Sequence, residues 1–292
     1  MGCTMCPRRC GADRRAGQVG YCGASGGIRV AKVMLHPWEE PCLIHGPGAG
    51  AIFFGGCPLH CVYCQNKAIS HGDVGEIWDT ARLGEEILRL AEAGASCIDL
   101  VSPTQYATDI LTALGRVKDR LTIPVVWNTG GYETVDTIHA CRGLVDVFLT
   151  DFKYGTEETA EKYSAAPDYV QVATDALIAM VETVGDPAWD GDRLMGGVIL
   201  RHLVLPGCRR DSEAALTAVA EAVDPASVIL SLMRQYTPDF APEEFTALRR
   251  RVTTFEYNAV LREAETLGFD GYFQSRTSAS ADFTPDFREK TF

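Results

Sequence analysis

The sequence predicts an α/β fold in which six strands form a partial (β/α)6 barrel of the TIM type, preceded by a small Cys-rich N-terminal extension. From residue 50 onward, short apolar runs of strand-forming residues alternate with longer segments of helical periodicity. The chain has 292 residues, and α/β barrels of roughly 200–250 residues commonly form one domain. This alternation favours parallel strands joined by right-handed helical crossovers.

The individual elements can be placed from these patterns. Strands are expected at about 51–56, 96–101, 123–128, 145–150, 196–204 and 228–232. Helices are expected at about 80–94, 104–118, 133–142, 169–184, 211–223 and 242–267. In the last helix, Phe245, Leu248, Val252 and Phe255 follow helical spacing, which indicates one packed face.

The chain divides into three parts by composition. Residues 1–49 are rich in Cys, Gly, Pro and Arg and show no helical period, so they cannot bury a core of their own. Within them, Gly26-Gly27 predicts a turn into a half-exposed strand over 28–33. We therefore expect a Cys-rich extension with a metal or cluster site (1–49), the barrel (50–274) and a tail that forms a docking strap or a frayed end (275–292).

Charge and hydropathy argue against two classes of partner. The net charge is −12 and no run of five Lys and Arg residues occurs, which disfavours a nucleic-acid-binding surface. Apolar stretches fall far short of the roughly 18–20 residues that span a bilayer, and residues 1–6 do not resemble a signal peptide. We therefore expect a cytoplasmic protein that binds neither nucleic acid nor a membrane.

Eleven cysteines in such a chain indicate metal or catalytic use, because the cytosol keeps thiols reduced. The strongest signal is the C-x3-C-x2-C loop of Cys57, Cys61 and Cys64, directly after the first expected strand. Soft thiolate ligands select iron–sulfur clusters or zinc. Three thiolates on a four-iron cluster leave one iron open for a substrate or cofactor, whereas a zinc knuckle needs a fourth ligand such as His60.

This loop, with an aromatic residue before its third cysteine, resembles that of the radical S-adenosylmethionine (SAM) superfamily. The resemblance implies a 4Fe-4S cluster on Cys57, Cys61 and Cys64 whose open iron binds the amino and carboxylate groups of SAM. An electron from a flavodoxin- or ferredoxin-type reductant then splits SAM to a 5′-deoxyadenosyl radical, which abstracts hydrogen from a substrate. It also implies that Tyr63 packs near the adenine.

Further motifs resemble the PflX-type branch, whose members are homologues of pyruvate formate-lyase activating enzymes. They are Cys6-Pro7-Arg8-Arg9-Cys10, Trp38-Glu39-Glu40-Pro41, Gly48-Ala49-Gly50, Ile52-Phe53-Phe54 and Cys64-Gln65-Asn66. The resemblance implies an activase that abstracts a backbone Gly hydrogen from a glycyl-radical enzyme. Radical modification of a small molecule or a peptide stays open. So does a non-catalytic iron–sulfur electron carrier, although carriers usually complete the cluster with four cysteines.

Barrel enzymes carry their chemistry at the carboxyl ends of the strands. After the second strand, Ser102, Pro103 and Thr104 stand where the activating enzymes have a Gly-Gly-Glu turn for the SAM amino group. Because the acidic residue is missing, backbone carbonyls of this turn and Thr104 are expected to accept those hydrogen bonds. A helix start with Ser102 or Thr104 as the N-cap is an equally good and compatible interpretation.

At the ends of the third and fourth strands, Asn128, Thr129, Asp151 and Lys153 match residues of the activating enzymes near the SAM carboxylate and a bound monovalent cation. Asp151 and Lys153 are two residues apart, so they face one pocket. Asn128 stands where those enzymes have an Asp, which removes one charge from the cation site. Alternatively, Asp151 caps the following helix.

Arg201 lies in the apolar run of the fifth strand, where an unpaired Arg is costly, so we expect it to pair with a buried carboxylate. The matching Arg of the similar enzymes lies beside SAM; a purely structural ion pair is the alternative. Gln235 and Tyr236, after the sixth strand, are expected to face the substrate or the adenine. His202 faces the other way by strand alternation and is interpreted as structural.

A second cysteine set lies in the N-terminal extension. Cys3, Cys6, Cys10 and Cys22 supply four soft ligands to a segment that lacks a core. Structural zinc contributes on the order of 10–16 kcal/mol in such peptides, which is enough to order this segment. A second 4Fe-4S cluster accepts the same four thiolates, and so does zinc. Free thiols are the third interpretation, and Cys42 could replace one of the four.

Overall fold

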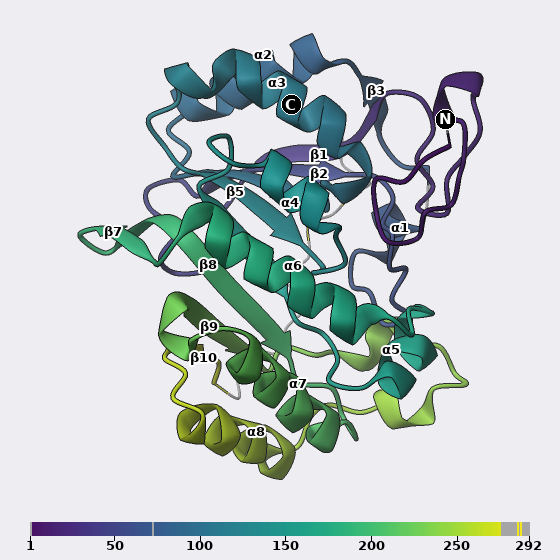
Figure 1. Cartoon of the computed structure of the whole chain (residues 1–292), viewed down its shortest axis with the longest axis vertical. Helices are drawn as coiled ribbons and strands as arrows, with labels where there is room; N and C mark the ends of the chain where they lie inside the picture. Colours follow the sequence, from purple (N-terminus) through teal and green to yellow (C-terminus); the bar gives the residue numbers. More distant parts are fainter. Residues whose placement is uncertain (1, 72, 276–284, 286, 288–292) are drawn as a thin grey trace.

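The fold is organised around one mostly parallel sheet (Figure 1). The computed structural model describes residues 2–71, 73–275, 285 and 287. Its strands are β1 Ile28–His36, β2 Ala49–Phe54, β3 Glu76–Trp78, β4 Ile98–Val101, β5 Val125–Thr129, β6 Val147–Asp151, β7 Ala188–Asp190, β8 Arg193–Leu203, β9 Val228–Met233 and β10 Gly271–Phe273. Across the sheet they follow the order β10-β9-β8-β6-β5-β4-β2-β1-β3, and β7 pairs with the start of β8.

The six expected strands correspond to β2, β4, β5, β6, β8 and β9. Neighbours in this series pair in parallel, and their order in the sheet is their order in the chain. Right-handed β-α-β crossovers produce this order. Among the described residues, β10 and β3 stand at the two ends of the sheet, so strand pairing does not close it into a ring. The predicted α/β fold with a mostly parallel sheet is confirmed.

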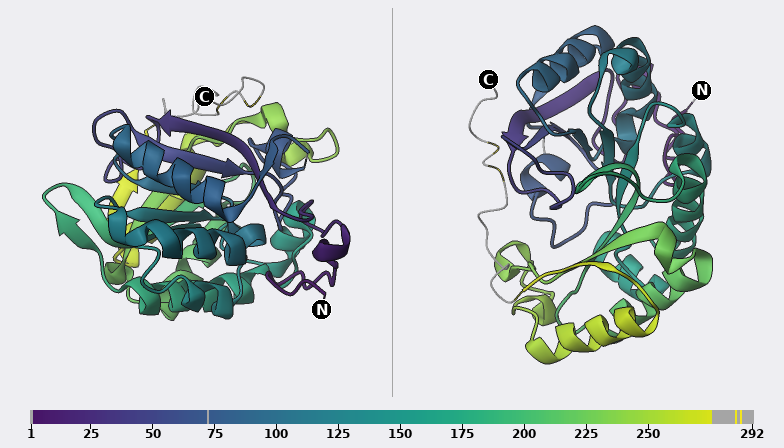
Figure 2. Two further views of the ribbon diagram at one scale, coloured as in Figure 1. Left: turned by 90° about the horizontal axis from the view of Figure 1, so that it is seen from above. Right: turned by 90° about the vertical axis from the view of Figure 1, so that its left-hand side faces the viewer.

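Helices pack against one face of this sheet (Figure 2). Helix α1, Lys67–Ser70, is an exception, since its Ile69 packs with Phe53 and Val101 on the opposite face. The helices of the first face are α2 Thr80–Glu92, α3 Ala107–Val117, α4 Val135–Ala140, α5 Glu157–Ser164, α6 Tyr169–Val184, α7 Arg209–Ala222 and α8 Thr254–Thr266. Alternate strand residues such as Leu100, Trp127, Phe148 and Leu200 are fully buried in the large apolar cluster that these helices complete. Strand alternation therefore points the intervening residues at the opposite face.

The opposite face changes from apolar to polar along each strand. Cys97, Val126, Leu149 and Ile199 form a smaller apolar cluster near the amino ends of their strands. The residue two positions further along each of these strands is polar, and these residues are Asp99, Asn128, Asp151 and Arg201. Because the strand period is two, each polar residue follows its apolar partner on the same face. A polar layer thus lies above an apolar one.

Residues 37–45, between β1 and β2, cover the amino end of this face. The Leu194 amide donates to the Cys42 carbonyl at 3.0 Å, and the Ser96 hydroxyl donates to the Leu43 carbonyl at 2.7 Å. These contacts hold the segment against the start of β8 and the residues before β4. We call residues 37–45 the floor segment. It closes the apolar end and leaves the polar end facing the strand carboxyl ends.

The structure corrects three expectations. The predicted helix over 242–267 begins only at Thr254, because Thr253 and Glu256 form a capping box that starts α8 there. Helix α5 was not expected; Thr156 caps its start. The strand predicted in the N-terminal extension is the longer β1, which pairs antiparallel with β2, so the boundary at residue 49 does not interrupt the sheet.

The predicted C-terminal tail lies mostly outside the described residues. Of the residues after Ser275, only Pro285 and Phe287 are described, and the Phe287 ring contacts the ring of Phe53 at 5.5 Å between centroids. Among the helices of the described residues, not one combines the length and the apolar character that crossing a bilayer requires.

Candidate functional site

The cysteine loop begins directly after β2 and is fixed by its contact with the N-terminal extension. Gly56 has a φ of 85°, and a Cβ there would lie 2.2 Å from the Cys22 carbonyl oxygen, so only glycine fits. The next amide, of Cys57, donates to that same carbonyl at 3.1 Å. The extension therefore packs directly against the loop that carries the three cysteines.

Cys61 is buried, Cys57 and Cys64 are half-buried, and each of the three sulfurs accepts a hydrogen bond. The donors are the Leu59 amide to Cys57 (3.5 Å), the Ser164 hydroxyl to Cys61 (3.0 Å) and the Ser70 hydroxyl to Cys64 (3.5 Å). Burial, and then the nearby Cys61 sulfur, raise the pKa of Cys57 to about 12 and also raise the pKa of Cys64. Positive ions are therefore needed to hold these sulfurs together as thiolates.

A buried hydrogen-bond chain supports the Cys61 sulfur. The Tyr63 hydroxyl donates to the Tyr154 hydroxyl at 2.9 Å, and Tyr154 lies 2.6 Å from the Ser164 hydroxyl that donates to Cys61. Sequence reasoning missed Ser164 and Tyr154, because they lie about 100 residues further along the chain, in and before the unexpected α5. Hydrogen bonds to cluster sulfurs help to set the potential of a cluster.

His60 does not join the sulfurs. Its ring stacks between Tyr21, at 5.1 Å, and His71, at 4.5 Å between centroids. Burial, and then the neighbouring His71, lower the pKa of His60 to about 4. Throughout the described ranges, no three His, Cys, Asp or Glu side chains are close enough together to hold a single metal ion.

The cysteines open onto a cavity of about 240 Å³ on the polar face of the sheet. Most of the predicted site residues line it, although they come from separate strands. These are Cys57, Cys61, Tyr63, Cys64, Ser102, Asn128, Thr129, Asp151, Lys153, Arg201, Gln235 and Tyr236. The carboxyl ends of parallel strands meet at one edge, which explains this convergence. The floor segment and β4 add Glu39 and Asp99 to the lining.

Two predicted residues lie elsewhere. Thr104 is buried beneath the turn, where its hydroxyl donates to the Glu133 carboxylate at 2.5 Å, and Pro103 precedes the short helix that Thr104 begins. Neither residue lines the cavity. Ser102 has a φ of 57°, and its carbonyl accepts a hydrogen bond from the Gln105 side chain at 2.8 Å. Of this turn, Ser102 alone faces the cavity.

Arg201 is the centre of the polar layer. Its guanidinium donates to Asp151 at 2.9 Å and to the Asn128 side-chain oxygen at 2.6 Å. Lys153 pairs with the other Asp151 oxygen. Burial would raise the pKa of Asp151, but Arg201 and Lys153 lower it below its ordinary value. The prediction that Arg201 pairs with a buried carboxylate is confirmed, and Asp151 does not cap a helix.

An acidic pair, Glu39 and Asp99, lies at the inner end of the cavity. Arg201 approaches Glu39 only to 3.9 Å, and the Asn128 side-chain amide donates to Asp99 at 3.3 Å. Burial raises the pKa of Asp99 to about 7, although Arg201 and Asn128 oppose the rise. Burial, and then Asp99, raise the pKa of Glu39 well above its ordinary value. An Asp within the apolar run Ile98-Asp99-Leu100 is the sequence signal that could have revealed this pair.

The four N-terminal cysteines gather beside the cysteine loop. A Cβ added at Gly20 would lie 3.4 Å from the Cys10 sulfur and 3.5 Å from the Cys22 sulfur. Burial raises the pKa of Cys6 to about 11, and the nearby Cys22, Cys3 and Cys10 thiols raise it as well. Cys42 is not part of this group, since it lies in the floor segment among the apolar residues of the inner face.

Arg8 ties the extension to the cysteine loop. It donates to the Pro58 carbonyl and to the Ser164 carbonyl, each at 2.8 Å. Its guanidinium also lies over the rings of Tyr21, at 4.4 Å, and Tyr132, at 5.1 Å. One side chain thus joins the extension, the loop and the segment that donates to Cys61.

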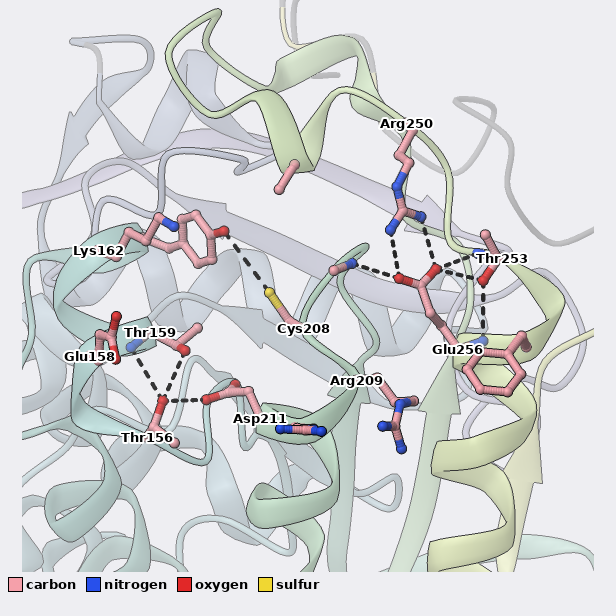
Figure 3. A pocket seen from close by; sticks show the side chains of 15 residues that line it. Thr156, Glu158, Thr159, Lys162, Cys208, Arg209, Asp211, Arg250, Thr253 and Glu256 are labelled. Carbon is pink, nitrogen blue, oxygen red and sulfur yellow. Dashed lines mark hydrogen bonds and ion pairs between the residues drawn. The ribbon is translucent and has the colours of Figure 1, made fainter.

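A second cavity, of about 730 Å³, is lined by residues of α5, of α7 and of the segment before α8, among them Lys162, Asp211 and Arg250 (Figure 3). Cys208 lies in it, 4.0 Å from the Tyr163 hydroxyl, and not in the cavity of the cysteine loop. Arg250 pairs with Glu256 at 2.6 Å, and Thr156 donates to Asp211 at 2.6 Å. The polar side chains of this second cavity thus largely find their hydrogen-bond and ion-pair partners among one another.

Comparison with known proteins supports the iron–sulfur assignment. Residues 44–165 match the family described as a 4Fe-4S single cluster domain, and this stretch contains Cys57, Cys61 and Cys64. The chain is 29% identical over 280 residues to the uncharacterized protein MJ0674 of Methanocaldococcus jannaschii, covering 92% of this chain and 75% of that protein. The crystal structure of methylornithine synthase (PylB) matches with a TM-score of 0.49 and 17% identity, over 82% of this chain and 67% of that one. The family match supports a 4Fe-4S cluster in this protein.

The acidic pair predicts a specific dependence of stability on pH. Asp99 binds its proton more tightly in the folded chain, where its pKa is about 7, than in the unfolded chain, where it is about 3.9. Its contribution to the free energy of unfolding is therefore complete below about pH 4 and is lost as the pH rises through 7. In the Asp99→Asn variant the free energy of unfolding should fall by about 1–4 kcal/mol less between about pH 4 and 8 than in the unmodified protein. Anaerobic denaturant unfolding at each pH measures this difference.

The exposed Asp175→Asn variant serves as the control and should decline like the unmodified protein. An Asp99→Asn variant whose stability declines as steeply as that of the unmodified protein would show that Asp99 is not protonated in the folded state.

Proposed function

We propose that this protein is a radical SAM enzyme that binds a 4Fe-4S cluster through Cys57, Cys61 and Cys64 and cleaves SAM reductively. One observation carries the proposal: the three-cysteine loop and the polar strand ends line a single cavity. Such a cluster, with SAM on its open iron, supplies the electron that splits SAM into methionine and a 5′-deoxyadenosyl radical. A flavodoxin- or ferredoxin-type protein is the proposed reductant.

The cysteine loop fits such a cluster in three respects. Its cysteines are buried or half-buried and each sulfur has a hydrogen-bond donor, as cluster thiolates commonly have. They are spaced too widely for one metal ion, which favours a multi-iron group over zinc. The backbone before the loop is fixed by the Gly56 and Cys57 contacts to Cys22, so the ligands are held in place before metal binds.

The polar strand ends are proposed to hold SAM. Lys153 and Arg201 are half-buried cations at the cavity wall, suited to its carboxylate, and Asp151 between them keeps both oriented. Asp151, with Asn128 and Thr129, also offers oxygen ligands for a monovalent cation. Ser102 lines the cavity, and its turn is proposed to accept the SAM amino group.

Three further side chains are proposed to enclose the adenosine part of SAM. Tyr63 and Tyr236 line the cavity and form an edge-to-face pair, with 6.3 Å between ring centroids. The Tyr236 hydroxyl is engaged by the Leu248 carbonyl at 2.6 Å, so this residue offers its ring rather than its hydroxyl. Gln235 lines the same wall.

The shape of the cavity bears on the substrate. Activation of a glycyl-radical enzyme requires a surface on which a partner loop can dock, and the resemblance to activating enzymes supports that role. Glu39 of the floor segment and Asp99, however, also line the cavity, and both side chains are mostly buried. Mostly buried carboxylates favour a small molecule or the end of a peptide as the substrate, and we place this class first.

We propose a second 4Fe-4S cluster on Cys3, Cys6, Cys10 and Cys22. The four thiols gather where the extension contacts the cysteine loop, and Arg14 donates to the Cys22 sulfur at 3.3 Å. Four thiolates close the coordination of a cluster, so this site would serve electron transfer or stability rather than SAM binding.

SAM cleavage is the direct test of the proposed function. The protein, reconstituted with iron and sulfide without oxygen and reduced with dithionite, should convert SAM to 5′-deoxyadenosine and methionine. Cys61→Ala should abolish the product, because it removes one of three cluster ligands. Cys141→Ala, which changes a thiol in the apolar core, should retain it. An intact, reduced cluster that leaves SAM uncleaved, with and without candidate substrates, would contradict the proposal.

Iron content tests the N-terminal site. Reconstituted protein should contain about eight irons per chain, and Cys22→Ser should lower the content to about four, since each cluster holds four irons. Cys22→Ser should also lower the midpoint of thermal unfolding, because the extension loses the bound group that stabilises its fold. About four irons in both proteins, together with one equivalent of zinc that Cys22→Ser removes, would identify a zinc site instead.

A further inference from the structure

The inner end of the cavity holds carboxylate oxygens that the protein does not satisfy. Asp99 is 1% exposed, and its Oδ1 has no hydrogen-bond partner in the described residues. Glu39 Oε2 likewise has no hydrogen-bond donor, since Arg201 stands 3.9 Å away. Both side chains line the cavity rather than the packed core. The two side chains that carry these unsatisfied oxygens therefore border a space that a ligand can enter.

The local charges do not balance. Glu39, Glu40, Asp99 and Asp151 lie at this end, and among the described residues around them Arg201 and Lys153 are the permanent cations. Asp151 pairs closely with both cations, Glu39 has only the longer ion pair with Arg201, and Glu40 accepts the Ser231 hydroxyl at 2.9 Å. Glu39 and Asp99 are left with a shared deficit of positive charge.

Glu133 shows how this chain treats a buried carboxylate that no ligand reaches. It is 1% exposed, like Asp99, but lies outside the cavity. Its oxygens accept hydrogen bonds from Thr104 (2.5 Å), Trp127 (3.0 and 3.2 Å) and Thr129 (3.0 Å). A buried carboxylate without such donors costs several kcal/mol. A shared proton removes part of the charge, but it cannot supply donors to both unsatisfied oxygens.

We propose that Glu39 and Asp99 bind a protonated amino group of the substrate. An ammonium group carries three donors and one positive charge, so it can satisfy both free oxygens and balance the pair. The group would enter from the cavity, past Arg201, and anchor an amine-bearing substrate beneath the SAM site. This inference rests on the proposed function, because it names the substrate class of that same cavity.

Binding of a simple amine tests the proposal without knowledge of the substrate. Isothermal titration calorimetry would compare n-butylammonium with n-butanol on the anaerobically reconstituted chain at about pH 8, where alkylamines stay protonated. Butylammonium should bind and butanol should not. Asp99→Asn and Glu39→Gln should each weaken binding at least about tenfold. Glu133→Gln, an equally buried carboxylate outside the cavity, should leave it unchanged. Circular dichroism would verify that each variant is folded.

Four results would overturn the inference. The first two are an absence of butylammonium binding and equal binding by the Asp99→Asn variant. The third is competition by equimolar K⁺ or Na⁺, which would mark an inorganic cation site. The fourth is displacement by SAM, which would assign the pair to the SAM amino group. SAM cleavage measured on the same samples separates the two proposals. Cleavage without butylammonium binding refutes the amine site alone, whereas binding without cleavage refutes the proposed function and leaves an amine-binding pocket.

Discussion

The charge of Arg201 is the constraint on which the inner face of this protein depends. Its guanidinium joins β8 to Asp151 of β6 and to Asn128 of β5, and it is the nearest cation to Glu39 of the floor segment. Without a buried cation here, carboxylates from two strands and a loop could not be held together away from water. Because strand alternation places each polar residue two positions after an apolar one, this charge network sits directly above a buried, packed apolar layer. The polar wall is thereby supported from below by the core.

The opposite end of the same cavity is organised by the N-terminal extension. Cys22 accepts the Cys57 amide, and Arg8 connects the Pro58 carbonyl to the Ser164 carbonyl, next to the hydroxyl that supports Cys61. The extension is therefore more than an appendage, since its contacts hold the loop on which the proposed cluster depends. Damage to the four N-terminal thiols would reach the cysteine loop through the Cys22 backbone.

Much of this arrangement could be predicted from sequence. The alternation of strand and helix patterns located six of the seven parallel strands of the described residues and missed the short β10, and the spacing of Cys57, Cys61 and Cys64 located the loop. What could not be predicted depends on contacts between distant residues. Thr104 has a hydroxyl group, as the prediction required, but this hydroxyl donates to the buried Glu133 and does not line the cavity. Ser164 donates to Cys61 from α5, a helix with too few apolar residues to be recognised from its periodicity. Glu39 lies in a loop without any periodicity, so only the folded chain brings it to Asp99.

The central claim is that a three-cysteine cluster and a SAM-binding wall share one cavity. Electron paramagnetic resonance of the dithionite-reduced Cys22→Ser variant, in which the N-terminal set lacks one of its four ligands and the loop cysteines are intact, tests it most directly. Addition of SAM should change the g-values of the reduced cluster, because SAM would bind its open iron, and Arg201→Met should require higher SAM concentrations for the same change. A spectrum of an intact cluster that saturating SAM leaves unaltered would contradict the account and would favour an electron carrier.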